Sequence, residues 1–152
     1  QSFVEGAGAI LLADIDHFKA INDRFGHQFG DKVIADFAAM LNEHATDRGC
    51  AARLGGEEFA ILLPGVSLDQ AITLAERMRR SLEDRRWPQS ANNNLVTASF
   101  GVTLLGGDEP FPSAIARADE LLYRAKQGGR NCVVGDTLSV VVPLRPSRAM
   151  LL

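Results

Sequence analysis

Residues 8–16 read GAILLADID, a short apolar run that ends in two aspartates. A run of this length predicts a buried strand with Asp14 and Asp16 at its C-terminal end. Further along, residues 50–63 read CAARLGGEEFAILL. Paired glycines supply the positive-φ conformations of a tight turn, so this segment predicts a β-hairpin that turns at Gly55-Gly56. If the hairpin lies beside the first strand, the carboxylates of both segments share one edge of a sheet.

Helical periodicity and turn residues fill the rest of the chain. Asp16 is a candidate N-cap for a short helix, Gly26 and Gly30 bracket a turn, and Ser67 with Gln70 forms a capping box. Strands that alternate with helices predict the α/β (α+β) class, with a mixed sheet covered by helices. The predicted elements are strand 8–15, helix 17–25, a helix from about 31, strands 50–54 and 57–63, helix 68–82, strand 95–105, helix 113–126 and strand 132–134.

Composition excludes several classes of protein. The chain has 152 residues and a net charge of −3, which is typical of one globular domain and not of a nucleic-acid binder. No apolar run reaches about 18 residues, so no membrane-spanning helix is expected. Cys50 and Cys132 lack a CxxC partner, and we expect both to be buried thiols of a cytoplasmic protein rather than metal ligands. The chain begins without Met, so we expect a fragment of a longer protein.

The acidic residues are candidate metal ligands. Asp14 and Asp16 close the first strand, and Glu57 and Glu58 follow the glycine turn. Mg²⁺ is usually held by one or two carboxylates, with substrate phosphates and water completing its shell. Two such ions about 4 Å apart suit an in-line displacement at phosphorus. The alternative is that these carboxylates are merely solvated.

Two further groups suggest a nucleotide ligand. Asn22 and Asp31, with His27 between them, offer the acceptors that match the N1–H and amino group of guanine. Lys126 and Arg130 flank a Gly-Gly turn at a helix end and form a candidate phosphate clamp, for which Lys19 is a third candidate. Helix capping and pairing with the helix dipole are the alternatives.

The chain resembles the GGDEF family, the diguanylate cyclases of bacterial signalling. The resemblance runs in order from about residue 10 to residue 134 and is far more specific than the signature pentapeptide alone. The segments that carry it are DIDHFKAIND (14–23), GH (26–27), GD (30–31), RLGGEEF (53–59), ASFGV (98–102), AD (118–119), YRAK (123–126) and GRN (129–131).

The resemblance implies a palm-like mixed sheet of about five strands flanked by helices, as in nucleotidyl cyclases and polymerase palms, with the signature on a β-hairpin. It also implies that two GTP molecules condense into cyclic di-GMP and two pyrophosphates. Each subunit would hold one GTP and face a second copy of the same domain in a transient homodimer. Mg²⁺ is the implied cofactor, and Mn²⁺ is an implied substitute.

The resemblance also implies roles for single residues. The metal ligands would be Asp14, the carbonyl of Ile15, Glu57 and Glu58. Glu57 would deprotonate the attacking hydroxyl, and Lys19 would stabilise the transition state. The implied substrate-binding residues are Phe18, Asn22, His27, Asp31, Ile34, Lys126 and Arg130. The signature is Gly55, Gly56, Glu57, Glu58 and Phe59.

The chain departs from the family pattern in three ways. Thr46 and Gly49 stand where many members carry an inhibitory Arg-x-x-Asp, so the primary product site is expected to be absent, with a solvent-facing Arg77 as its only remnant. We assign residues 1–135 to the GGDEF domain. The segment with which the family usually opens is missing from this range. Residues 136–152 form a tail that could add an edge strand. No regulatory domain of the parent protein is present, and that parent is either free in the cytoplasm or anchored to a membrane.

Other functions remain open at this point. The main alternative is a catalytically silent GTP-binding module that controls a partner. A pure interaction domain would bind no GTP. A cyclase acting on ATP is disfavoured by Asp31, because adenine would leave this carboxylate unpaired at a cost of about 1–3 kcal/mol.

Overall fold

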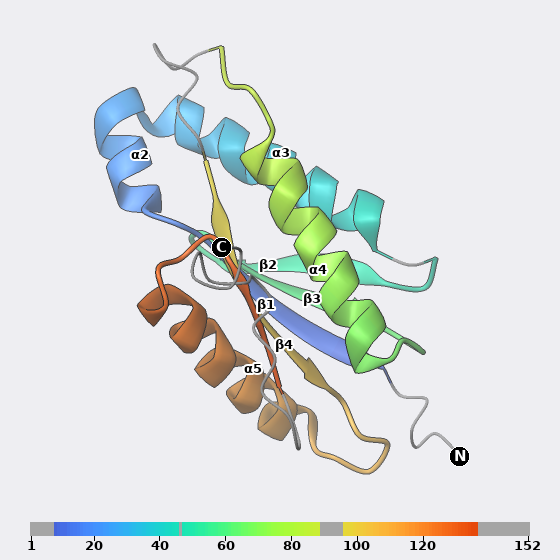
Figure 1. Cartoon of the computed structure of the whole chain (residues 1–152). Coiled ribbons are helices and arrows are strands. Elements are labelled where there is room, and N and C mark those ends of the chain that lie inside the picture. Colours follow the sequence, from blue (N-terminus) through green and yellow to red (C-terminus); the bar gives the residue numbers. More distant parts are fainter. Residues whose placement is uncertain (1–7, 46, 89–95, 137–152) are drawn as a thin grey trace, which may run out of the picture.

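A five-stranded sheet in the order β2-β3-β1-β4-β5 forms the centre of the computed structural model (Figure 1). The structure describes residues 8–45, 47–88 and 96–136. The predicted mixed sheet flanked by helices is confirmed. Its elements are β1 (Ala9–Ile15), α2 (Phe18–Phe25), α3 (His27–His44), β2 (Cys50–Gly55), β3 (Glu58–Leu63), α4 (Leu68–Glu83), β4 (Ala98–Leu104), α5 (Phe111–Gln127) and β5 (Val133–Gly135).

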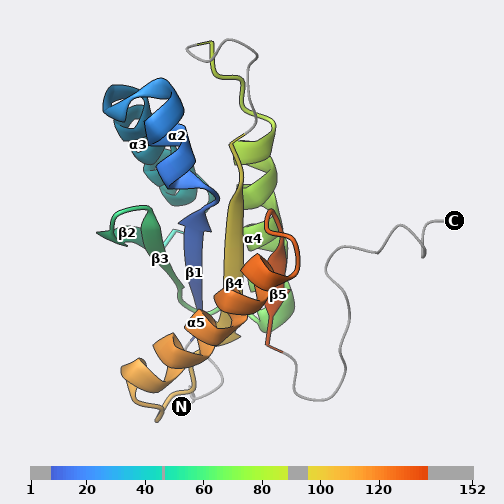
Figure 2. The same ribbon diagram turned by 90° about the vertical axis from the view of Figure 1, so that its left-hand side faces the viewer.

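β1 lies at the centre of the sheet. It pairs antiparallel with both β3 and β4, and β5 adds to β4 in parallel. Leu11 and Ala13 pack on the side covered by α3 and α4, whereas Ile10 and Leu12 pack against α5 (Figures 1 and 2). All seven residues of β1 are buried. Coverage of both faces explains why the strand is a continuous apolar run rather than an alternating one.

α5 packs closely on β4 because Gly101 has no side chain. A Cβ atom at this position would lie 2.3 Å from the carbonyl oxygen of Ala118 and 2.4 Å from the amide nitrogen of Leu122. The glycine that interrupts the apolar run of β4 therefore lets a helix backbone approach the sheet. None of the helices in the described ranges is both long and apolar enough to cross a membrane.

Two sequence predictions about helix starts are wrong. α3 begins at His27 and not near Asp31, because Gly26, at φ 94°, makes the whole break between α2 and α3. Gly30 is buried inside α3 and not in a turn. Asp16 does not cap α2: the N-cap residue is His17, in the left-handed conformation at φ 54°. The carboxylate of Asp16 is engaged elsewhere by other donors.

The prediction of buried thiols is also wrong for one cysteine. Cys50 is exposed because β2 is an edge strand that no helix covers fully, and Cys132 is half-buried. The capping box of Ser67 and Gln70 is confirmed, with hydrogen bonds of 3.1 and 2.9 Å. The predicted edge strand in the tail lies outside the described residues, apart from Asp136.

Candidate active site

The end of β1 and the start of β3 bring three carboxylates together. In the antiparallel register Asp14 lies opposite Glu58, and the amide of Ile15 donates a 3.2 Å hydrogen bond to the carbonyl of Glu57. Glu57 belongs to the turn, between the two strands of the hairpin. The hairpin therefore lies beside the first strand, an arrangement that the sequence left open, and the candidate ligands share one edge of the sheet.

Asp14 is the most buried of these carboxylates. Its side chain is 8% exposed, and desolvation raises its pKa above the usual value. The negative charges of Glu57 and Glu58 act in the same direction, whereas Lys126 opposes them. A buried carboxylate facing two other carboxylates has an excess of negative charge that a cation relieves.

Lys126 supplies one such cation. Its ammonium group forms an ion pair with Asp14, reaching it from the last turn of α5. The sequence predicted a phosphate-binding role for this lysine and gave no sign of the contact, because the two residues are 112 positions apart. Arg130 lies four residues further on, half-buried and left-handed at φ 63°.

The oxygen atoms at this edge are suitable ligands for a hard divalent cation. The carboxylates of Asp14, Glu57 and Glu58 and the backbone carbonyl of Ile15 offer only oxygen, the ligand atom that Mg²⁺ prefers. Within the described ranges, no group of three or more His, Cys, Asp or Glu residues is arranged to enclose a metal by itself. Mg²⁺ is usually bound by one or two protein carboxylates and completes its shell with water and substrate phosphates.

A second part of the site lies between α2 and α3. The side-chain oxygen of Asn22 is buried and has no hydrogen-bond partner. It rests against Gly30: a Cβ atom built there would lie 1.8 Å from this oxygen and 3.2 Å from the ring of Phe18. An unsatisfied buried acceptor loses free energy unless a ligand supplies a donor. This atom is therefore suited to contact a bound molecule.

The remaining predicted residues surround this contact. His27, Asp31 and Ile34 follow one face of α3 at helical spacing; the first two are exposed, and Ile34 is 7% exposed. Lys19 is not in contact with the carboxylate edge. Its side chain is 90% exposed, and it pairs with Asp23 on its own helix at 3.0 Å.

Comparison with known proteins identifies this arrangement. The family model described as "Diguanylate cyclase, GGDEF domain" matches residues 4–132. The chain belongs to the GGDEF family. Diguanylate cyclase VdcA of Vibrio cholerae is 47% identical over 131 residues, which cover 83% of this chain and 38% of VdcA. The chain thus spans well under half the length of this relative.

Solved GGDEF domains share the fold. The active GGEEF domain of a diguanylate cyclase from Vibrio cholerae superposes with a TM-score of 0.79 at 34% identity, covering 86% of this chain and 83% of that one. The GGDEF domain of DgcB from Caulobacter crescentus, solved in complex with c-di-GMP, gives 0.78 at 37% identity, covering 84% and 74%.

Two buried polar residues of this GGDEF domain make contacts that the sequence did not indicate: Asp16, expected to be a helix cap or a metal ligand, and Arg79, which was not singled out. Asp16 is buried and accepts hydrogen bonds from Thr97, Ser99 and Asn131. Arg79, only 6% exposed, lies between carboxylates of α4. Two signals could have revealed them: hydroxyl residues at period two in an apolar strand, and an arginine next to the apolar stripe of a helix.

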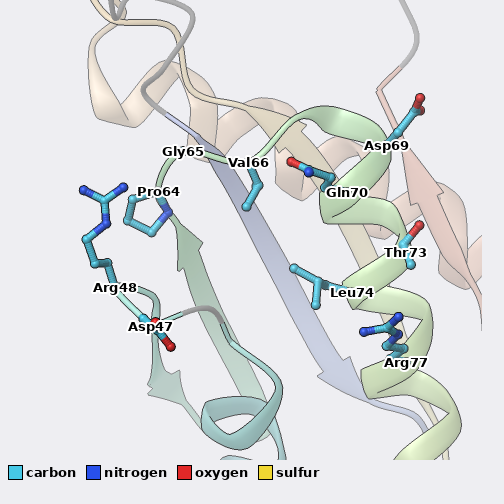
Figure 3. A pocket seen from close by; sticks show the side chains of 10 residues that line it. All are labelled: Asp47, Arg48, Pro64, Gly65, Val66, Asp69, Gln70, Thr73, Leu74 and Arg77. Atoms are coloured by element: carbon cyan, nitrogen blue, oxygen red, sulfur yellow. The ribbon is translucent and has the colours of Figure 1, made fainter.

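A cavity of about 580 Å³ lies beside Asp47 and Arg48, in the segment compared above with the family's inhibitory motif (Figure 3). Arg48 and the exposed Arg77 lie on its opposite walls. A Cβ atom at Gly49 would lie 2.9 Å from the carbonyl oxygen of Leu62, so the backbone leaves little room for an aspartate there. Thr46 lies outside the described residues. The cavity is lined by Asp47, Arg48, Pro64, Gly65, Val66, Asp69, Gln70, Thr73, Leu74 and Arg77.

Proposed function

We propose that this domain is the catalytic unit of an active diguanylate cyclase, which condenses two GTP molecules into cyclic di-GMP and two pyrophosphates. The observation that supports this most directly is the convergence of Asp14, Glu57 and Glu58 at one open edge of the sheet. A nucleotidyl transfer needs carboxylates that bind a metal and accept a proton, and these three side chains can do both.

The reaction is a substitution at phosphorus carried out twice. The 3′-oxygen of one GTP attacks the α-phosphorus of the other, and a new phosphorus–oxygen bond forms. The bond from that phosphorus to the bridging oxygen of the β-phosphate breaks, and pyrophosphate leaves with the electron pair. We assign the proton of the attacking hydroxyl to Glu57. Because the protein makes no covalent bond, positioning and charge stabilisation supply most of the rate enhancement.

The carboxylates of Asp14, Glu57 and Glu58, with the carbonyl of Ile15, are the proposed ligands of Mg²⁺, for which Mn²⁺ could substitute. When bound, the metal would polarise the phosphate oxygens and offset their charge. The resident contact of Lys126 with Asp14 supports a cation at this point, since the buried carboxylate already attracts one.

Residues on both sides of that edge would bind the nucleotide. Asn22 and Asp31 would pair with the donor edge of guanine, and the unsatisfied buried oxygen of Asn22 supports this assignment. His27 would lie beside the base. The base pocket would also be lined by Phe18 and Ile34, and the phosphates would meet Lys19, Lys126 and Arg130.

A second copy of the domain would supply the second GTP. One subunit can present only one nucleotide to its own carboxylates, so two copies must face each other for the ring to close. The exposed residues of β2 leave the hairpin side of the sheet accessible to such a partner. Because GTP is a cytoplasmic nucleotide, we place the domain in that compartment.

The test is product analysis with a matched pair of variants. Concentrated protein is incubated with GTP and Mg²⁺, and the products are separated by chromatography. Cyclic di-GMP should form at a rate that rises faster than linearly with protein concentration. Glu57→Gln should lower this rate by at least about 10²-fold, the usual cost of removing a group that acts in the transition state. Glu120→Gln, the same change at an exposed position of α5, should leave the rate unchanged.

Two outcomes would contradict the proposal. Full activity in Glu57→Gln would remove the assigned base. Binding of GTP with no product, in a protein that carries the family's opening segment and a dimerising fusion, would instead favour the silent regulatory module.

A further inference from the structure

The carboxylate of Asp16 is engaged on both of its oxygens. It is 6% exposed and lies just beyond the end of β1, two residues after Asp14. One oxygen accepts the hydroxyl of Ser99 at 2.7 Å. The other accepts the hydroxyl of Thr97 at 2.7 Å and the backbone amide of Asn131 at 2.9 Å. The end of β1, the start of β4 and the loop after α5 therefore meet at one side chain.

The loop after α5 has an unusual backbone. Gly129, Arg130 and Asn131 follow one another at φ angles of 114°, 63° and 49°. Two consecutive non-glycine residues in the left-handed region are strained, and such strain persists only when the surroundings fix it. Asparagine tolerates this region better than most residues. The loop must therefore be held by specific contacts.

Asn131 is held through both its backbone and its side chain. Its amide donates to Asp16, its side-chain oxygen accepts a 2.7 Å hydrogen bond from Arg79, and its side-chain nitrogen donates to Glu83 at 2.8 Å. The neighbouring amide of Arg130 donates to the carbonyl of Ala125 at 3.0 Å. The position of Arg130 thus depends on contacts made by the residues around it.

We propose that Asp16 is a positioning residue that fixes the loop bearing Arg130 relative to Asp14, and that it is not a metal ligand. By holding the amide of Asn131, it keeps the phosphate-binding side of the site at a constant distance from the carboxylate edge. Only the assignment of phosphate to Arg130 rests on the proposed function. The tether itself is a property of the protein without nucleotide.

Two substitutions at this position separate a tether from a metal ligand. In Asp16→Asn, the amide oxygen can still accept from Thr97 and Asn131, and the amide nitrogen can donate to Ser99, because a hydroxyl is both donor and acceptor. Asp16→Ala can make none of these bonds. A metal ligand would be impaired in both variants, whereas a tether is lost only in the second.

The first measurement is hydrogen exchange of the Asn131 amide, by NMR, in the absence of nucleotide. In Asp16→Ala the amide should exchange at least about tenfold faster, because its opening no longer breaks a hydrogen bond to a buried carboxylate. In Asp16→Asn its rate should stay near that of the wild type. Continued protection in Asp16→Ala, with the rest of the domain folded, would overturn the proposal.

The second measurement is steady-state kinetics. Asp16→Ala should raise the KM for GTP by about tenfold or more, the scale expected when a binding group is misplaced, while kcat changes less. Asp16→Asn should restore the wild-type KM. Equal defects in both variants would indicate a ligand role and overturn the proposal. If the wild-type protein shows no turnover, the proposed cyclase activity is contradicted. The hydrogen-exchange experiment would still test whether Asp16 holds the loop.

A further variant guards against misfolding of Asp16→Ala. Asn131→Gly keeps a residue that accepts the left-handed φ and removes the side-chain hydrogen bonds to Arg79 and Glu83. Exchange of the amides at positions 130 and 131 should become faster in this variant. Unchanged exchange there would show that the loop does not depend on these contacts.

Discussion

At the scale of single residues, Lys126 determines the charge balance of the site. Its ammonium pairs with a carboxylate that is 8% exposed, and this carboxylate also faces the charges of Glu57 and Glu58. A divalent cation at the same edge would compete with the lysine for Asp14. The lysine stabilises the buried carboxylate of Asp14 through this ion pair, and under the proposed function a bound metal would release it to contact phosphate.

Lys126→Met should destabilise the protein when metal and nucleotide are absent. The substitution leaves a buried carboxylate without its charged partner, which costs about 1–3 kcal/mol of the free energy of unfolding. Urea denaturation at pH 7 measures this loss. Lys19→Met is the matched control, because Lys19 is 90% exposed and its surface pair with Asp23 should contribute less than about 1 kcal/mol. Equal losses in both variants would argue against the pairing.

Gly30→Ala should weaken GTP binding while leaving the fold intact. The new Cβ atom would lie 1.8 Å from the side-chain oxygen of Asn22, so that side chain must move away from its present position. Misplacing a positioning group by about 1 Å can cost about 10²-fold in rate, and because Asn22 is proposed to bind the base, we expect the loss in KM. Alanine itself favours a helix by about 1 kcal/mol over glycine. Gly106→Ala, where the nearest atom is 3.6 Å away, is the control for both KM and thermal stability. An unchanged KM in Gly30→Ala would show that Asn22 does not take part in recognising the base.

At the scale of elements, α4 supports the active-site loop through a buried arginine. Arg79 donates hydrogen bonds to carboxylate oxygens of Glu76 and Glu83 on its own helix and to the side-chain oxygen of Asn131 in the loop after α5. Burial by itself would raise the pKa of Glu76, but the hydrogen bonds from Arg79 and Arg80 outweigh it, and the net pKa lies below the usual 4.5. The ionised pair therefore stabilises the folded state.

This shift predicts the sign of a pH dependence. A carboxyl group whose pKa is lowered by folding contributes stability above pH 4.5, and that stability is lost as the pH falls through the lowered pKa. Glu76→Gln should therefore be less stable than the wild type at pH 7 and should lose less stability on acidification below pH 4.5. Urea denaturation between pH 3 and pH 7 tests this. Glu120→Gln, on the exposed side of α5, should retain the wild-type slope; the same slope in Glu76→Gln would refute the coupling.

At the scale of the whole molecule, the sequence predicts the helices and strands better than the side-chain contacts between them. The apolar run of β1, the glycine turn of the hairpin and the capping box at Ser67 are local signals, and all three are confirmed. Gly30 was interpreted as a turn because its real partner, Asn22, belongs to another helix. Asp16 looked like a helix cap because its donors lie 81 to 115 positions away. Contacts of that range leave no periodic signal.

Regulation by the product is also a property of the whole molecule. We expect added cyclic di-GMP to leave the initial rate of GTP consumption unchanged, because Gly49 stands where the resemblance expects the motif's aspartate, and a Cβ atom there would lie 2.9 Å from the carbonyl oxygen of Leu62. The measurement is the initial rate as a function of product concentration. Inhibition that disappears in Arg77→Ala would show that the cavity of Figure 3 still binds the product.

The central place of β1 has a consequence during synthesis. This strand leaves the ribosome before either of its neighbours, because Ala9 pairs with Leu63 on one side and with Leu104 on the other. Until both arrive, a nascent chain exposes seven residues with two unpaired edges, the kind of segment that aggregates or recruits a chaperone. The charges of Asp14 and Asp16 act as gatekeepers at its end. The same two aspartates thus place negative charge beside the apolar strand while its neighbours are still missing.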